Sequence, residues 1–422
     1  MSLVALSHPT NKLYGGILLP TSKSISNRAL LINASLGDIT TIKHLSNADD
    51  TLLMQKALPQ LTGTIHLKNA GTCMRFLTAY FAAKPGSDIV LECDARMEKR
   101  PIESLVNTLQ FLGANIEYVR QNGFPPLHIK GKSLIGKTVA IDASESSQFV
   151  SALMLIAPLI GGKLTLQLTG NVASKPYIDM TAEVMRYFGL SVNINYPQIH
   201  IDATPEIKPN TVITIEKDWS AASYWYQIVA LSTDAEIVLK GLTRKSVQGD
   251  SSISEYMKYF GVETTEINNG LLLKKVQAQD LHNQHNHPLS IELTNEPDLA
   301  PCLVVCAAAS NRCFLFTGLH NLILKESNRI EALVTELSQL GFDISHNQQM
   351  DCIVVNKMQK NSKPVAKNHV IQTYGDHRMA MAFAPLALVV KHIVIENPDV
   401  VKKSYPHFWD DLKKVGFVIE EI

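Results

Sequence analysis

Basic side chains in short Ser-, Thr- and Gly-rich motifs are the residues of this sequence best suited to chemistry. They are Lys23, Arg28, Arg75, Arg100, Lys325, Arg329, Arg378 and Lys403, of which Lys23, Arg75 and Arg378 stand at the start of apolar, helix-like runs. Arg binds carboxylate and phosphate groups through a planar fork, and Lys binds them as a point charge. The chain has 39 Lys and Arg against 39 Asp and Glu, so its formal net charge is zero. Local cations in a neutral chain predict small, multiply anionic ligands and argue against nucleic acid.

Six small polar clusters each precede an almost wholly apolar, Ala-rich run. A helix that is apolar all round must be buried, yet its first turn keeps unsatisfied N–H groups and partial positive charge, so it can bind an anion. The simpler interpretation is that the clusters are only N-caps, and for 218–220 both interpretations stay open. Lys23, Arg75 and Arg378 oppose the helix dipole, which predicts a bound anion or a nearby carboxylate. The clusters are residues 21–24, 69–72, 146–148, 218–220, 296–298 and 375–378, and the runs are 28–34, 73–83, 149–160, 221–231, 299–309 and 379–390.

A second kind of helix is amphipathic and ends at a glycine, from which a short alternating strand begins at once. Glycine takes the left-handed conformation that ends many helices without steric cost. The recurrence predicts six copies of one α/β unit, three in each of two domains, with the join near Ile215–Asp218. The domains expected are 21–216, and 1–20 with 217–422, the strand Gly16–Leu19 belonging to the second. The helices are Leu105–Leu112, Ala182–Phe188, Ser254–Phe260, Leu333–Leu340 and Phe408–Val415, with a looser copy that runs through Leu52–Leu61, Gly63 and Thr64–Leu67.

Length and composition agree with this division into two domains and exclude several classes of protein. The 422 residues suit two domains, and 45% hydrophobic with only 18% charged residues exclude a disordered protein. No apolar run reaches the roughly 20 residues of a membrane span. The six cysteines form no CxxC pair, and Cys302 and Cys306 are expected to be buried thiols, which indicates a reduced, cytoplasmic protein. Without a GxxxxGK[ST], GxGxxG or HExxH motif, we expect no nucleotide cofactor and no metal.

Seven segments together carry a resemblance to a known family. In order they read LPTSKSISNR (19–28), NAGTCMR (69–75), RP (100–101), SSQF (146–149), SKPY (174–177), KESNR (325–329) and YGDHRMA (374–380). They resemble the 5-enolpyruvylshikimate-3-phosphate synthases, a family of enolpyruvyl transferases, from about residue 8 to the C-terminus. The resemblance implies two inside-out α/β domains, each of three βαβαββ units, that close on the substrates.

The resemblance also implies the reaction. The enolpyruvyl group of phosphoenolpyruvate would pass to the 5-hydroxyl of shikimate 3-phosphate, with release of phosphate through a tetrahedral intermediate. This step belongs to chorismate and aromatic amino acid biosynthesis and uses no metal or cofactor. The partners expected are therefore the two small anionic substrates, with no nucleic acid and no membrane, and the chain is expected to be a monomer.

Site residues follow from the resemblance position by position. Asp298 would be the base on the hydroxyl, Glu326 the acid at the methylene carbon, and Lys23 a proton shuttle or charge stabiliser. Asp298 could instead be only a helix cap, and Glu326 could pair with Arg329 at i,i+3. Shikimate 3-phosphate would contact Lys23, Ser24, Arg28, Ser146, Ser147, Gln148, Ser174, Asp298, Asn321 and Lys325. Phosphoenolpyruvate would contact Lys23, Gly71, Arg100, Gln148, Arg329, Arg378 and Lys403.

Two positions depart from the family's pattern, and two other functions remain open. Thr21 stands where glycine is usual, and Phe76 stands where proline usually follows the arginine of the second motif. One alternative is the related transferase that acts on UDP-N-acetylglucosamine, although residues 119–127 lack the cysteine which that family uses. The other is a non-catalytic anion-binding protein of the same fold, which would be expected to lose Asp298, Glu326 or Lys23.

Overall fold

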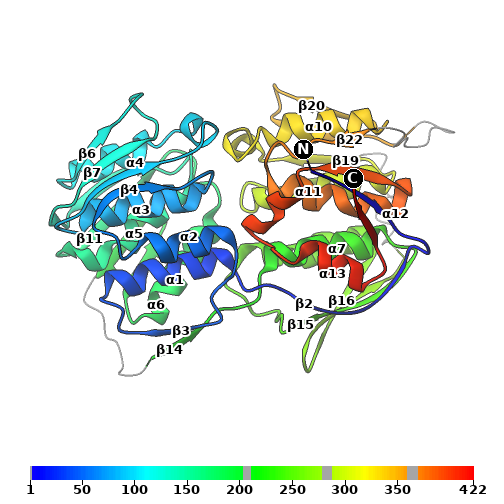
Figure 1. The fold of residues 1–422 in the computed structure, drawn as a ribbon, viewed down its shortest axis with the longest axis horizontal. Coiled ribbons are helices and arrows are strands. Elements are labelled where there is room, and N and C mark those ends of the chain that lie inside the picture. The colour runs from blue at the N-terminus through cyan, green and yellow to red at the C-terminus, as the bar shows by residue number, and fades with distance from the viewer. Residues whose placement is uncertain (1, 203–210, 278–287, 359–368) are drawn as a thin grey trace. The chain divides into compact units, whose positions relative to one another are not determined.

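The structure is a computed structural model that describes residues 2–202, 211–277, 288–358 and 369–422. Its contacts divide the chain into two compact units (Figure 1). The first unit is Thr21–Glu216, and the second combines Met1–Pro20 with Lys217–Ile422. Among the described residues, no helix combines the length and the apolar character that a bilayer crossing needs.

Five four-stranded sheets share one pairing pattern, in which a parallel pair is followed by two antiparallel partners. Burial alternates along strands such as β11 and β15, so one face of each sheet is packed and the other is solvated. The first unit has β4 (Thr62–His66), β5 (Asp88–Glu92), β7 (Leu127–Lys130) and β6 (Asn115–Tyr118) in one sheet, and β12 (Ser191–Asn195), β13 (Gln198–Asp202), β11 (Leu164–Thr169) and β9 (Thr138–Asp142) in another.

The second unit contains the other three of these sheets. One uses both chain ends, because β1 pairs with β23 and β24 in antiparallel register. The strands are, sheet by sheet, β16 (Val262–Ile267), β17 (Gly270–Lys275), β15 (Asp234–Lys240) and β2 (Lys12–Leu18); β18 (Leu289–Glu292), β19 (Phe314–Thr317), β21 (Cys352–Val355) and β20 (Ile344–Asn347); and β22 (Val370–Ile371), β23 (Ile393–Glu396), β1 (Leu3–Ser7) and β24 (Val418–Glu421).

The sixth predicted copy is smaller than the others. Within the described residues its sheet is a two-stranded parallel ladder of β14 (Val212–Thr214) and β3 (Thr41–Lys43). The first unit also contains a short parallel pair, β8 (Leu134–Ile135) and β10 (Ile160–Gly161). The α/β fold with repeated βαβαββ units is thus present, with one copy reduced in the part of the chain that the structure describes.

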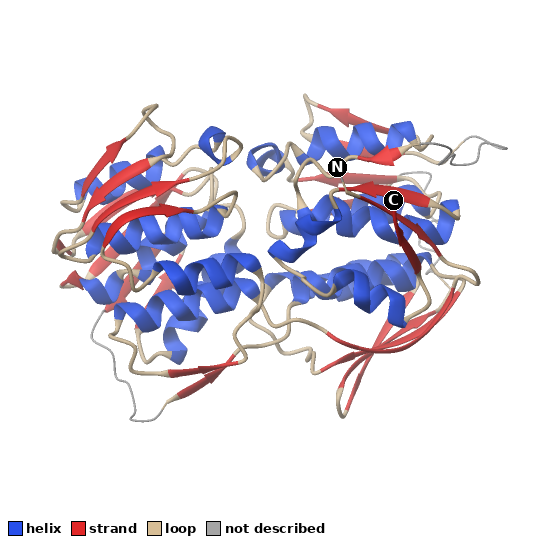
Figure 2. Cartoon of the chain, viewed as in Figure 1, coloured by secondary structure: helices blue, strands red, loops and turns tan. Residues whose placement is uncertain are grey.

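The apolar runs form buried helices that pack on one another inside each unit, and the amphipathic helices lie outside them (Figure 2). In α3, 12 of 13 residues are buried, as its apolar composition predicts. The inner helices are α1 (Lys23–Ser35), α3 (Gly71–Ala83), α5 (Ser147–Leu155), α7 (Trp219–Leu231), α9 (Ala300–Ala309) and α11 (His377–Phe383), extended by α12 (Ala387–Val390). The amphipathic series comprises α2 (Asp49–Ala57), α4 (Glu103–Phe111), α6 (Lys175–Tyr187), α8 (Ile253–Tyr256), α10 (Arg329–Gln339) and α13 (Phe408–Lys414).

The glycines behave as the repeat predicts, with one correction. Gly113, Gly189, Gly261, Gly341 and Gly416 all have positive φ, between +73° and +106°, where a helix gives way to a strand.

The looser copy is wrong in detail, because α2 ends at Ala57 and Gly63 lies inside β4. Residues 58–62 read LPQLT, and Pro59, which lies two residues after the end of α2, cannot continue the helix, so it marks the helix end better than Gly63 does.

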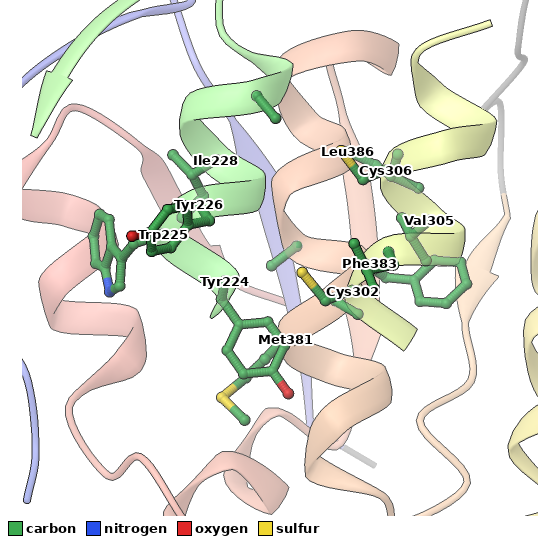
Figure 3. Close-up of a cluster of buried hydrophobic side chains, with 14 of the residues drawn as sticks. Tyr224, Trp225, Tyr226, Ile228, Cys302, Val305, Cys306, Met381, Phe383 and Leu386 are labelled. Carbon is green, nitrogen blue, oxygen red and sulfur yellow. The ribbon is translucent and has the colours of Figure 1, made fainter. Parts of the chain in front are cut away.

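The core of the second unit fixes the helices whose first turns carry charged groups. Figure 3 shows Tyr224 of α7, Cys302 of α9 and Met381 close together among buried side chains. Cys302 Sγ donates to the Ser223 carbonyl at 3.2 Å, and Gln227 Nε2 donates to the Ala382 carbonyl at 2.8 Å. These contacts tie α7 to both neighbouring helices. Cys302 and Cys306 are buried thiols, as the sequence predicts.

Candidate active site

Lys23 opens α1 and is paired with a buried carboxylate. Its N-cap, Ser22, accepts a hydrogen bond from the Ile25 N–H at 3.4 Å. Lys23 Nζ lies 3.0 Å from Oδ2 of Asp50, which is buried in the first turn of α2. The sequence predicts an anion or carboxylate near this cation, and Asp50 supplies the carboxylate. Asp50 is not among the predicted site residues, although an acidic pair that opens a helix is a usable signal.

Arg28 lies one turn further along α1 and is almost fully buried, at 3% exposure. Its Nε donates to Thr181 Oγ1 at 2.7 Å and its Nη1 to the Ser24 carbonyl at 3.0 Å. Longer bonds of 3.4 Å run from Nη2 to Ser151 Oγ and to the Tyr177 carbonyl. Because all four described acceptors are neutral, burial lowers the pKa of Arg28 to about 10. The side chain stays charged at neutral pH and can attract an anion.

Gly71 is the first residue of α3, and two buried guanidinium groups converge on it. A Cβ atom placed on Gly71 would lie 2.5 Å from Nη1 of Arg75 and 2.6 Å from Nη1 of Arg100. Ala70, the N-cap, makes no side-chain capping bond. An open helix start with two Arg side chains over a residue that has no side chain suits a small anion.

The start of α5 is joined to the start of α3. Ser146 is the N-cap and accepts from the Gln148 N–H at 3.3 Å. Gln148 Nε2 donates to Thr72 Oγ1, also at 3.3 Å. This hydrogen bond brings Gln148 beside Thr72, the residue that follows Gly71.

Ser174 precedes α6 in the left-handed conformation, with φ +59°, and is buried. Its carbonyl accepts from the Tyr177 N–H at 3.1 Å, and the Tyr177 carbonyl in turn accepts from Arg28. The first unit therefore gathers predicted residues from the starts of α1, α3, α5 and α6.

Arg329 forms the centre of a charged cluster in the second unit. It is the first residue of α10 and is 1% exposed. Its Nε lies 2.8 Å from Asp376, its Nη1 2.9 Å from Asp298, and its Nη2 2.8 Å from Glu326. Burial alone would lower the pKa of Arg329, but the three carboxylates outweigh it and raise the pKa above its usual value. The guanidinium is therefore a fixed charge.

Asp298 meets three cations. Lys325 Nζ and Arg329 Nη1 lie 3.1 and 2.9 Å from its Oδ1, and Arg378 Nη2 lies 3.1 Å from its Oδ2. Burial raises the pKa of Asp298, but the three cations together hold it well below its usual range. The carboxylate belongs to the short 3-10 turn Pro297–Leu299 and makes no capping bond there. The interpretation of Asp298 as only a cap is wrong.

Glu326 is held between two cations. Arg329 Nη2 contacts its Oε2 at 2.8 Å, so the i,i+3 pair exists, and Lys403 Nζ contacts its Oε1 at 3.0 Å. The pairing with Lys403 brings a residue 77 positions away into the cluster. Asn321 lies buried in the turn before Lys325 and makes no polar contact with the cluster among the described residues.

Asp376 is a member of this charged cluster that the sequence reasoning missed. It is 0% exposed, caps α11 by accepting from the Arg378 N–H at 2.9 Å, and accepts two bonds from Arg329 at 2.8 and 3.3 Å. The available signal was its place two residues ahead of Arg378 at a helix start, which also fits a simple cap. Asp376 is a cap and an anchor for Arg329 at once.

Two residues of the cluster 218–220 have different roles, one as a helix cap and one in the charged cluster. Asp218 is the N-cap of α7 and accepts from the Ala221 N–H at 3.1 Å. Ser220 donates to the buried Asp250 and accepts from Arg378 Nη2 at 3.5 Å. The cap interpretation holds for Asp218, while Ser220 helps to orient Arg378.

The comparisons with known proteins bear on the whole chain. The family model of EPSP synthase (3-phosphoshikimate 1-carboxyvinyltransferase) matches residues 7–67 and 62–412. The 3-phosphoshikimate 1-carboxyvinyltransferase of Bacteroides fragilis is 46% identical over 408 residues, which cover 96% of each chain. The chain belongs to the EPSP synthase family. The enzyme of the same name from Colwellia psychrerythraea is 33% identical over 97% of this chain and 98% of its own.

Solved structures agree with this EPSP synthase assignment at the level of the fold. An EPSP synthase from Acinetobacter baumannii superposes with a TM-score of 0.75 at 22% identity, and the match covers all of both chains. The enolpyruvyl transferase NikO from Streptomyces tendae superposes with a TM-score of 0.71 at 14% identity. The predicted family and fold class of this EPSP synthase family member are therefore confirmed.

Proposed function

We propose that this chain is a cytoplasmic, monomeric 3-phosphoshikimate 1-carboxyvinyltransferase whose two units are its two enolpyruvyl transferase domains. It transfers the enolpyruvyl group of phosphoenolpyruvate to the 5-hydroxyl of shikimate 3-phosphate and releases phosphate. The observation that carries the proposal is the set of carboxylates that hold Lys325, Arg329, Arg378 and Lys403 in one cluster, in a chain of this family. Such a cluster matches two substrates that are both multiply anionic.

Both substrates use cationic groups, and shikimate 3-phosphate takes most of the neutral hydroxyl and amide groups. Shikimate 3-phosphate takes the hydroxyl and amide groups at the starts of α5 and α6 together with the charge of Arg28, which no described carboxylate neutralises. Phosphoenolpyruvate takes the Arg and Lys groups near Gly71 and in the second unit. The first set is Lys23, Ser24, Arg28, Ser146, Ser147, Gln148, Ser174, Asp298, Asn321 and Lys325, and the second is Lys23, Gly71, Arg100, Gln148, Arg329, Arg378 and Lys403.

Asp298 serves as the base on the 5-hydroxyl, and the substrates themselves adjust its proton affinity. With three cations against it, the carboxylate has a low pKa and is a weak base. Phosphate and carboxylate groups compete for Lys325 and Arg378, and each cation that turns toward a substrate raises the pKa of Asp298. The base is therefore strongest when both substrates are bound.

Glu326 donates the proton to the methylene carbon. Arg329 and Lys403 lie 2.8 and 3.0 Å from its two carboxylate oxygens, so the cations that hold the acid can also contact the phosphoenolpyruvate carboxylate. Lys23 lies at the start of α1, where it balances charge or moves a proton while the tetrahedral intermediate forms and loses phosphate.

The two alternative functions find less support. The relatives at 46% and 33% identity are both named 3-phosphoshikimate 1-carboxyvinyltransferase, which disfavours UDP-N-acetylglucosamine as the acceptor. A binding protein without catalysis would have no need to keep Asp298, Glu326 and Lys23 together with their charged partners.

Phosphate release with each acceptor tests the proposal. We expect release with shikimate 3-phosphate and phosphoenolpyruvate, and none with UDP-N-acetylglucosamine; release with neither acceptor would favour the binding protein. Asp298→Asn should lower kcat at least about 100-fold, because a positioned base contributes that much or more. Asp399→Asn, at an exposed aspartate of the same unit, is the matched control. An Asp298→Asn variant that turns over at the wild-type rate would show that another group is the base.

A further inference from the structure

The ring of Phe76 lies against the guanidinium group of Arg28. Cζ of Arg28 is 5.4 Å from the ring centroid, which is within the range of a cation–π contact. Phe76 belongs to α3 and Arg28 to α1, and these two inner helices pack together in the first unit. The two side chains are 0% and 3% exposed, so water does not weaken the contact.

The hydrogen bonds of Arg28 leave its charge in place. Four N–H groups of the guanidinium point to a hydroxyl of Thr181, a hydroxyl of Ser151 and the carbonyls of Ser24 and Tyr177. All these described acceptors are dipoles, and two of the bonds are long, at 3.4 Å. A buried charge without a carboxylate is costly. The electron-rich face of the ring offsets part of that cost.

An aromatic ring and a carboxylate stabilise a buried cation with different consequences for a ligand. A carboxylate neutralises the cation, so an anionic ligand must compete with it, as at the Lys23–Asp50 and Arg329–Asp376 pairs. A ring attracts the cation through its quadrupole and has no net charge. Arg28 against Phe76 therefore keeps its positive charge, which can attract an anion.

We propose that Phe76 is a positioning residue for shikimate 3-phosphate, because its ring holds Arg28 in place and stabilises the guanidinium without neutralising it. The inference rests on the proposed function, in which Arg28 binds that substrate. Since Arg28 would contact the substrate equally before and during the reaction, loss of the ring's contribution should weaken substrate binding and leave the chemical step unchanged.

Fluorinated phenylalanines at position 76 test the proposal with little change in side-chain volume. One, two and three fluorine atoms withdraw electron density from the ring and weaken its attraction for a cation in steps. We expect the KM for shikimate 3-phosphate and its calorimetric Kd to rise stepwise, to roughly three- to tenfold with three fluorines. The kcat and the KM for phosphoenolpyruvate should stay within about twofold.

Phe81 provides the matched control, because it is a fully buried ring of the same helix that packs against Tyr80. The same fluorine series at Phe81 should leave the affinity for shikimate 3-phosphate unchanged. Phe76→Leu should also raise the KM for shikimate 3-phosphate, since leucine fills space without a quadrupole.

The outcomes separate this inference from the function on which it rests. If Phe76→Leu raises the KM while the fluorine series is flat, the ring only fills volume and the proposal is overturned. An equal rise for both substrates would also overturn it. A wild-type protein that releases no phosphate and binds no shikimate 3-phosphate would instead refute the proposed function.

Discussion

Gly71→Ala should weaken the binding of phosphoenolpyruvate by pushing two arginines out of place. The new Cβ would stand 2.5 Å from Nη1 of Arg75 and 2.6 Å from Nη1 of Arg100, whereas ordinary contact begins at 3.4 Å. Each guanidinium must therefore retreat by about 0.8–0.9 Å. Gly71 has a helical backbone, so alanine itself fits there, and the free energy of unfolding should change by less than about 1 kcal/mol.

Coulomb's law gives the size of the loss. At an effective dielectric constant of about 20, unit charges about 4 Å apart attract by about 4 kcal/mol. A retreat of about 0.9 Å weakens that attraction by about 0.8 kcal/mol. Arg100 is the one of the two that belongs to the phosphoenolpyruvate set, and its retreat of about 0.8 Å costs about 0.7 kcal/mol, which corresponds to a rise of about threefold in the KM for phosphoenolpyruvate.

Initial rates of phosphate release, with one substrate saturating and the other varied, measure this effect. The KM for shikimate 3-phosphate should stay within about twofold, because the atoms nearest the new methyl group belong to Arg75 and Arg100, and neither is in the set assigned to that substrate. Gly161→Ala is the control, since its Cβ would meet only the Leu134 carbonyl, at 3.7 Å. A Gly71→Ala enzyme that folds normally and keeps the wild-type KM for phosphoenolpyruvate would refute the reasoning.

Two further predictions concern buried carboxylates of the second unit. Asp376→Asn should lower the unfolding free energy by about 2–4 kcal/mol and lower kcat/KM, because Arg329 loses a fully buried partner. A loss below about 0.5 kcal/mol, measured by urea denaturation, would contradict this prediction. Burial, with the nearby Asp250 carboxylate, raises the pKa of Glu296 from 4.5 to about 7. The folded state therefore binds the proton more tightly, and stability falls as pH rises from 4.5 to about 7. In the Glu296→Gln variant, the fall in unfolding free energy between pH 5 and 8 should be smaller than in the wild type by about 2 kcal/mol. Equal pH slopes for the two proteins would contradict this prediction.

Local signals in the sequence were sufficient for many of the elements. Gly113 and its counterparts end helices, because only a few adjacent residues decide whether the chain can turn left-handed. The apolar runs became inner helices, because composition alone decides that such a helix must be buried. The same reasoning failed at Gly63, which lies inside a strand, because a positive φ also occurs in strands and the flanking pattern is weak.

Charged pairs between distant positions lay beyond that reasoning. Asp50 and Asp376 are unremarkable as helix-start acids, and each becomes important only through its partner, Lys23 or Arg329. Phe76 is one apolar residue among many until α1 and α3 pack and place its ring against Arg28. No periodicity or cap rule specifies which of many carboxylates or rings meets a given cation.

By itself, the sequence determined which segments are helices, at which glycines most of the amphipathic helices give way to strands, and which family motifs they carry, because these properties depend on neighbours within a turn or two. Tertiary structure alone decided that Arg329 also meets Asp298 and Asp376, and that Arg28 meets the hydroxyl of Thr181 and the ring of Phe76. The reason is that Coulomb and cation–π energies depend on separations of a few ångströms, and only the packing of helices far apart in the chain sets those separations.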